Sequence, residues 1–202
     1  AEIEFAPFIS MGHSANGQLS WNIPNWNPER TIAAFPVKTV PLPGSLKFEG
    51  VPLCYVVGET TEWPQYRDGR QGDRDFFWPN VRNSAVKLRT SSENNLIGVV
   101  TDPGGGHFDW SKRQAQFIAL YIRKACKYRL PEKQSPGLPV KLKKINKESG
   151  WLTDIGGMEP DKFTAASYKK YKGDPKNAYW LFDKETAIEA VEVCGDGKTR
   201  DK

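Results

Sequence analysis

The chain carries a serine, several carboxylates and a histidine in an order that could support nucleophilic catalysis. Ser14 lies in a short polar turn, and His107, one of only two histidines, follows a run of three glycines. A serine hydroxyl is a weak nucleophile, so it needs an imidazole as general base. A carboxylate is then needed to hold the imidazole tautomer and to stabilise its cation. These residue types are those of acyl transfer through a covalent acyl-enzyme.

The surroundings of Ser14 read PFISMGHSANG over residues 7–17. An apolar strand, a sharp turn that carries a serine and a following helix are the context of a nucleophile elbow, which exposes the hydroxyl at the carboxyl edge of a sheet. Small residues are needed on both sides of the serine. Gly12 meets this need on the near side, whereas Asn16 stands on the far side with Gly17 one position late. An ordinary strand-to-helix turn has the same short pattern, so this motif alone is weak.

His107 follows the last predicted parallel strand, 96–100, on the glycine loop 104–106. The carboxyl edge of the strands is where ligands bind in open α/β folds. Three glycines allow the loop to bring a side chain back over that edge. A histidine at a helix entry can also serve only as a cap or a packing residue, but its position after Ser14 and a loop acid favours the catalytic interpretation.

The orienting carboxylate is expected on the polar loop Gly58–Asp75, directly after the apolar run 51–57. Loops of this length inside a compact domain are usually functional. Asp75 is explained as the cap of the next helix. Glu62 lies in the turn that would return toward the histidine, and Glu59 directly follows the strand end. The sequence favours Glu62 as the acid and keeps Glu59 as the alternative. The loop also offers Asp68 and Asp73.

Three uninterrupted apolar runs, 31–37, 51–57 and 96–100, predict strands that are buried on both faces. Amphipathic helices are expected from Asp75 onward and from Ser111 to about Lys127, where Ser111 and Gln114 form a capping box. The prolines at 24 and 28 are expected to stop the first helix. The alternation of these strands and helices along the chain predicts an α/β fold, with a mainly parallel sheet flanked by helices. The inward-facing residues are expected to be Phe77, Val81, Ala85 and Leu88 on the first of these helices, and Phe117, Ile118, Tyr121, Ile122 and Ala125 on the second.

The character of the chain changes at Pro131. We expect residues 1–130 to form the α/β region and 131–202 to form a small irregular C-terminal extension packed on it. Within the extension, 140–145 alternates like an exposed edge strand. Asp183 is expected to cap a last helix whose inner face carries Ala187, Ile188 and Val191.

Composition limits the function classes. Net charge is +5, but acids and bases are interspersed, which argues against nucleic-acid binding. No apolar run approaches the ~20 residues of a membrane span. The three cysteines, Cys54, Cys126 and Cys194, match no zinc pattern, and no cofactor or metal is indicated. Cys54 and Cys126 are expected to be buried free thiols.

Four pieces of the sequence, APFISMGHSANG, VPLCYVVGE, GGGHFDW and QAQFIALYIRKA, resemble the second half of an α/β-hydrolase of the serine esterase or lipase type. The chain order of nucleophile, acid and histidine is also that of α/β-hydrolase triads. The resemblance covers about residues 6–130. The tail is similar to those of bacterial secreted or periplasmic proteins of that superfamily.

The resemblance implies Ser14 as nucleophile, His107 as base, an acid best placed at Glu62 or else Glu59, and the Ala15 N–H as one oxyanion donor. Hydrolysis of a carboxyl ester would follow, without a cofactor, on a small-molecule or glycan ester. Aromatic side chains are expected to line the entrance, namely Trp63, Tyr66 and Trp110.

In that fold several strands come before the nucleophile strand, so a sheet starting there would have an exposed apolar edge. We therefore expect this chain to be one piece of a larger protein, with a second chain or a preceding segment completing the sheet. The alternative function is a non-catalytic binding module for carbohydrate or a protein partner on a hydrolase scaffold.

Overall fold

The computed structural model describes residues 3–40, 46, 48, 50–58, 78–92, 94–102, 104–154 and 164–194. Within these ranges the chain forms two β-sheets and four α-helices. Single turns of 3-10 helix also occur at Ile3–Phe5, Ser14–Asn16, Lys147–Ser149, Tyr168–Lys170 and Pro175–Asn177.

The main sheet has four parallel strands that are adjacent in chain order. They are β1 (Phe8–His13), β2 (Thr31–Val37), β3 (Pro52–Gly58) and β4 (Leu96–Asp102). Every residue of β2, β3 and β4 is buried. The predicted strands and the α/β class are therefore confirmed, and the uninterrupted apolar runs have the expected cause, which is cover on both faces.

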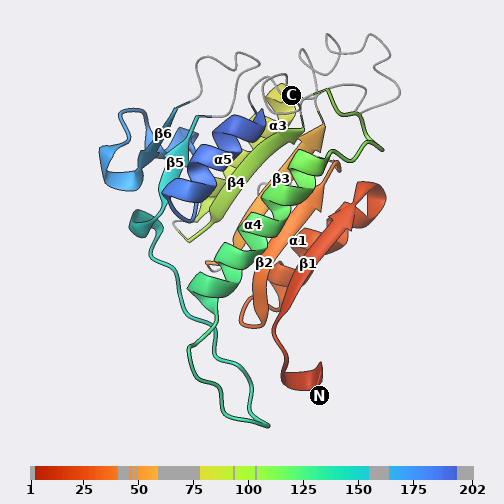
Figure 1. Ribbon diagram of the computed structural model, residues 1–202, viewed down its shortest axis with the longest axis vertical. Coiled ribbons are helices and arrows are strands. Elements are labelled where there is room, and N and C mark those ends of the chain that lie inside the picture. The colour runs from red at the N-terminus through yellow and green to blue at the C-terminus, as the bar shows by residue number, and fades with distance from the viewer. Residues whose placement is uncertain are drawn as a thin grey trace.

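Helices cover both faces of this sheet (Figure 1). Behind it lie α1 (Gly17–Trp26) and α3 (Trp78–Ser91), which precede β2 and β4, and in front lie α4 (Lys112–Arg129) and α5 (Lys184–Cys194). The predicted inner face of α4 is buried at Phe117, Ile118, Tyr121 and Ala125, and Ile122 packs against the core. On α3 the predicted residues Val81, Ala85 and Leu88 are buried. Asp75 and Phe77 lie outside the described residues.

The expected stop at Pro24 is wrong, because α1 continues to Trp26 with this proline inside it. Proline removes a single backbone donor, and the helix ends within three residues, so the loss is confined to the last turn. The side chain is buried, which offsets part of that cost. The Asn27 N–H closes the final turn on the Ile23 carbonyl, and Pro28 follows the helix end.

The C-terminal region forms a second, antiparallel sheet that the sequence analysis missed. Its strands are β5 (Trp151–Thr153), β6 (Ala165–Ser167) and β7 (Tyr179–Leu181), in the order β6-β5-β7. Three residues are too few to produce a readable alternation. Tight packing supports the sheet at Gly150, where a Cβ atom would lie 2.2 Å from the indole nitrogen of Trp180.

The predicted edge strand 140–145 is wrong, since this segment has no regular structure. Its backbone bonds to the end of α4 instead of to a strand. The Lys143 N–H donates to the Arg129 carbonyl at 2.7 Å, and the Lys143 carbonyl accepts from the Arg129 guanidinium at 3.2 Å.

Asp183 caps α5 as predicted, because its carboxylate accepts from the Thr186 N–H at 3.0 Å. The predicted inner face of this helix is partly wrong. Ile188 is 39% exposed, whereas Ala187, Ala190 and Val193 are buried. Small side chains on the buried face allow α5 to lie close to α4 and β4, which it contacts.

One hydrophobic core joins the α/β region to the C-terminal region. The ring of Tyr121 on α4 lies 4.7 Å from that of Phe182, which directly follows β7. A Cβ atom at Gly98 in β4 would lie 3.0 Å from the Trp180 carbonyl oxygen, so β7 packs directly on β4. The 131–194 part thus contributes to the same core as the main sheet.

The main sheet has two edge strands, β1 and β4, since no other described strand pairs with their outer sides. Unlike the other three strands, β1 is only partly buried. Met11 is 51% exposed and Trp26 on α1 is 80% exposed, with Leu19 also exposed. Exposed apolar side chains therefore lie on β1 and on the neighbouring helix α1.

All three cysteines are free thiols. Cys54 and Cys194 are buried, whereas Cys126 is half-buried. Burial raises the pKa of Cys54 well above its usual value and that of Cys194 to about 11, so neither thiol ionises near neutral pH. None of the described helices has the length and apolarity to cross a membrane.

Candidate active site

Ser14 stands at the end of β1 with a left-handed backbone, φ 56°. Positive φ is uncommon for residues other than glycine and marks a turn held by its surroundings. The residue begins the 3-10 turn Ser14–Asn16, which leads directly into α1. The strand, the sharp turn at the serine and the helix are the features of a nucleophile elbow.

Two glycines make room for this turn. A Cβ atom at Gly12 would lie 2.1 Å from the Asn16 carbonyl oxygen, so only glycine fits there. A Cβ atom at Gly17 would lie 2.4 Å from Thr39. Asn16 itself is exposed and has an ordinary helical backbone, φ −72°. The need for a small residue beyond the serine is therefore met at Gly17, and asparagine at position 16 causes no strain.

The structure brings Ser14 and His107 together. The Nε2 atom of His107 lies 2.8 Å from the Ser14 Oγ atom, and both residues are half-buried. The two residues come from opposite edges of the sheet order, after β1 and after β4. The distance is that of a hydrogen bond.

A buried lysine holds the loop that carries His107. Lys38 follows β2 with a positive φ of 46°, and its ammonium group lies 3.1 Å from the Asp102 carboxylate. The same group donates to the carbonyl oxygens of Gly106, at 2.7 Å, and of Asp109. Both charged side chains are fully buried. This ion pair fixes the loop on each side of the histidine.

Asp102 also holds the start of α4, the helix that follows the loop. Its second oxygen accepts from the Ser111 hydroxyl at 2.6 Å, and Ser111 caps α4 by accepting from the Gln114 N–H. The carboxylate of Asp109 accepts from the Gly106 N–H at 2.8 Å. Both acids that flank His107 in the sequence are therefore engaged in holding the loop.

The predicted acids Glu62 and Glu59 lie outside the described residues. The strand that precedes them ends at Gly58, which pairs in register with Asp102 at the end of β4. The Gly58–Asp75 loop thus starts at the edge of the sheet where the His107 loop also starts.

Aromatic rings lie beside His107 and His13. The Nε2 atom of His13 is 2.7 Å from the His107 carbonyl oxygen, and its ring lies 5.8 Å from that of Trp110 and 5.9 Å from that of Phe108. Phe108 is 76% exposed and Trp110 is also exposed. Trp110 is thus placed at the site, whereas the predicted Trp63 and Tyr66 lie outside the described residues.

Phe108 and Lys38 were not among the site residues predicted from the sequence. Phe108 could have been found from its position directly after His107. Lys38 gives no such signal, because a lysine after a strand normally points into solvent. Ala15, the predicted oxyanion donor, follows Ser14 in the first helical turn, where backbone N–H groups have no intrahelical acceptor.

Within the described part of the chain, no group of three or more His, Cys, Asp or Glu side chains could hold a metal ion. Comparisons with protein-family models, with curated proteins and with solved structures found no match.

Proposed function

We propose that this protein is a serine hydrolase of carboxyl esters that acts through an acyl-enzyme. The observation that carries the proposal is the Ser14–His107 pair, in which a serine with left-handed backbone has its Oγ atom 2.8 Å from an imidazole nitrogen. A strained serine at a strand end, within reach of a base, is the arrangement that nucleophilic catalysis requires.

In the proposed reaction, neutral His107 takes the Ser14 proton on Nε2 while Oγ attacks the ester carbonyl carbon. The tetrahedral intermediate collapses, His107 gives the proton to the leaving alkoxide oxygen, and an acyl-serine remains. Water, activated by the same nitrogen, then attacks the acyl carbon and releases the carboxylic acid. The Ser14 hydroxyl and neutral His107 are restored.

Two further groups complete the proposal. The oxyanion of the intermediate would accept from the Ala15 N–H, which belongs to the first helical turn. A carboxylate on the loop after Gly58 would hold His107 through Nδ1, with Glu62 as the first choice and Glu59 as the second. The reaction needs no metal or organic cofactor.

The aromatic side chains at the entrance favour substrates with a ring. Phe108 and Trp110 are exposed beside the pair, so they can stack on an aromatic or sugar-bearing ester. The same exposed rings support the alternative function, a non-catalytic module that binds carbohydrate. Glycan binding without ester turnover would favour that alternative.

We also propose that the free edge of β1 pairs with a further strand, from a second chain or from another segment of the same protein. Support comes from the partial burial of β1 and from the exposed Met11, Leu19 and Trp26 side chains. Exposed apolar edges are normally covered in native proteins.

Pre-steady-state hydrolysis of p-nitrophenyl butyrate tests the enzymatic proposal. The protein should release p-nitrophenol in a burst equal to the enzyme concentration, because the acyl-enzyme accumulates. Ser14→Ala should lose the burst, and His107→Asn should lower kcat by a factor of at least about 10³.

The matched control is Ser10→Ala, which removes a buried serine hydroxyl from β1, the strand that leads to Ser14. It should keep the burst. A burst of wild-type size from Ser14→Ala would rule out Ser14 as the nucleophile. If the wild type and all variants show no burst and hydrolyse the ester at the same slow rate, catalysis by this pair is ruled out.

A further inference from the structure

A cavity lies at the other end of the main sheet from the Ser14–His107 pair. Its lining includes residues that precede strands, namely Pro28, Glu29 and Arg30 before β2, Gly50 before β3 and Asn94 before β4. Ser14 and His107 instead follow strand carboxyl ends. A seven-residue strand spans roughly 20 Å, so the two sites are separate. The cavity volume is about 670 Å³, within the range of small-molecule sites.

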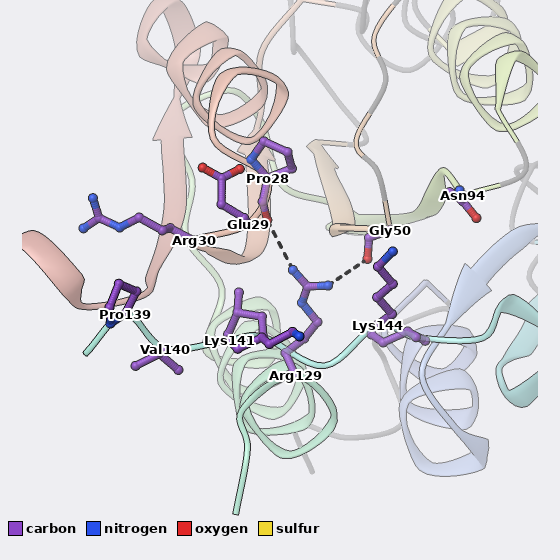
Figure 2. Close-up of a pocket in the computed structure, with 12 residues that line it drawn as sticks. Pro28, Glu29, Arg30, Gly50, Asn94, Arg129, Pro139, Val140, Lys141 and Lys144 are labelled. Atoms are coloured by element: carbon purple, nitrogen blue, oxygen red, sulfur yellow. Dashed lines mark hydrogen bonds between the residues drawn. The ribbon is translucent and has the colours of Figure 1, made fainter. Parts of the chain in front are cut away.

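Arg129, the last residue of α4, lies at the centre of this cavity wall (Figure 2). Its side chain is only 4% exposed. The guanidinium donates to four backbone carbonyl oxygens, those of Pro28, Thr31, Gly50 and Lys143, at 3.4, 2.8, 3.4 and 3.2 Å. These bonds use its four terminal N–H groups. They fix the strand starts and the 139–145 segment around the cavity.

The charge of Arg129 is not neutralised by the described part of the chain. None of its hydrogen-bond partners is a carboxylate, and its Nε atom is buried without a partner. Burial lowers its pKa to about 10, so the group stays cationic at neutral pH. A buried cation without an opposite charge is unfavourable, and an anion bound nearby would offset that cost.

Two exposed lysines, Lys141 and Lys144, add to the positive charge of the cavity. Neither forms an ion pair or a side-chain hydrogen bond with the described residues. Including Arg30, the lining has four cationic side chains and one carboxylate, that of Glu29. The cavity is therefore electrostatically suited to an anion.

Most of the remaining lining is apolar. The apolar walls are formed by Pro28, Pro139, Val140, Leu142 and Ile145. Val140, Leu142 and Ile145 are half-buried, and Leu142 and Ile145 also pack against the hydrophobic core. A purely inorganic anion would leave these walls in contact with water, whereas a ligand with a hydrocarbon portion would cover them.

We propose that this cavity binds an organic monocarboxylate with an apolar chain. The carboxylate pairs with Lys141 and Lys144, near the buried charge of Arg129, and the hydrocarbon chain lies along the apolar wall formed by Val140, Leu142 and Ile145. The site is separate from the catalytic pair and does not depend on the proposed ester hydrolysis.

Calorimetric titration with decanoate tests the proposal at constant ionic strength, since salt screens these charges. Decanoate should bind at least about tenfold more tightly than decan-1-ol, which lacks the charge, and than inorganic phosphate, which lacks the chain. The double substitution Lys141→Ala/Lys144→Ala should weaken decanoate binding by at least about tenfold. Both side chains are exposed, so the fold should be retained, which thermal unfolding checks.

The matched control is Lys172→Ala/Lys176→Ala, which removes two exposed lysines that do not line the cavity. It should bind decanoate as the wild type does. Amide shifts on titration should move at Gly50 and Asn94, and not at Ser14 and His107. If Ser14 can be blocked covalently, the blocked protein should still bind decanoate.

Four outcomes would overturn the proposal: no decanoate binding up to millimolar concentration, equal affinity for decan-1-ol, wild-type affinity in the Lys141/Lys144 variant, or shifts confined to the catalytic edge. The last outcome would place the carboxylate at the Ser14–His107 pair as a reaction product. Failure of ester turnover, in contrast, would leave the binding result unchanged.

Discussion

At the scale of single residues, the backbone of Ser14 is the feature that most separates this turn from an ordinary one. A side chain at φ 56° carries a steric cost that glycine does not, of about 1 kcal/mol. The surrounding glycines, Gly12 and Gly17, maintain this conformation by admitting close backbone and side-chain contacts. The site therefore stores strain at the residue that we propose as the nucleophile.

We predict that Ser14→Gly is more stable than Ser14→Ala by about 0.5 to 1 kcal/mol. Both variants lack the hydroxyl, so their difference reports the backbone alone. Urea denaturation measures it. The same comparison at Ser20, inside α1, should reverse, because glycine is less favourable than alanine in a helix by about 1 kcal/mol. Equal stabilities of the two Ser14 variants would argue against strain at the turn.

At the scale of elements, the buried Lys38–Asp102 pair connects β2 to the loop between β4 and α4. We predict that Lys38→Met destabilises the protein by about 3 to 5 kcal/mol, because it leaves the Asp102 carboxylate buried without its cation. Adding Asp102→Leu to Lys38→Met should recover part of this loss. Chemical denaturation of the two single variants and the double variant measures the coupling energy. Purely additive effects would show that the pair is not coupled.

A second element-scale prediction concerns the N-terminus of α5. Burial alone would raise the pKa of Asp183, but hydrogen bonds from Lys124, Thr186 and Tyr128 outweigh it and lower the pKa below its usual value. A carboxyl with a lowered folded-state pKa stabilises the protein above the unfolded-state pKa of about 4. This contribution is lost as pH falls through the folded-state pKa.

The free energy of unfolding should thus fall more steeply below pH 4 in the wild type than in Asp183→Asn. The difference between the two proteins at pH 7 should be modest, because Asp183 is partly exposed and solvent screens the Lys124 contact. Denaturation at several pH values checks this. Parallel pH profiles would mean that Asp183 has no lowered pKa.

At the scale of the whole molecule, the C-terminal region shares its core with the main sheet. Gly98 of β4 packs on the Trp180 backbone, and Tyr121 of α4 packs on Phe182. We predict one cooperative unfolding transition, with the same midpoint by tryptophan fluorescence and by far-UV circular dichroism. Two separated midpoints would show that residues 131–194 unfold independently.

The sequence predicted the parts of the fold that depend on long apolar patterns. The strands β2, β3 and β4 are buried throughout, so their runs are continuous, and Ser111 and Asp183 cap helices as their residue types indicate. The juxtaposition of Ser14 and His107 followed from their places after two strands of one parallel sheet.

The remaining features depend on contacts between distant segments, which a single sequence does not display. Lys38 is buried only because Asp102, 64 residues away, meets it. The three-residue strands β5, β6 and β7 form because they pack on the main core. The 140–145 segment has the alternation of a strand, but Arg129 and the end of α4 take its backbone bonds.

The central claim, that Ser14 is a nucleophile activated by His107, is tested most directly by labelling with a fluorophosphonate and measuring intact mass. The account predicts a single phosphonyl adduct on the wild-type protein, located at Ser14 by peptide mapping. It predicts no adduct on Ser14→Ala and much slower labelling of His107→Asn. An adduct that forms on Ser14→Ala at the wild-type rate, or no adduct on the wild-type protein, would contradict it.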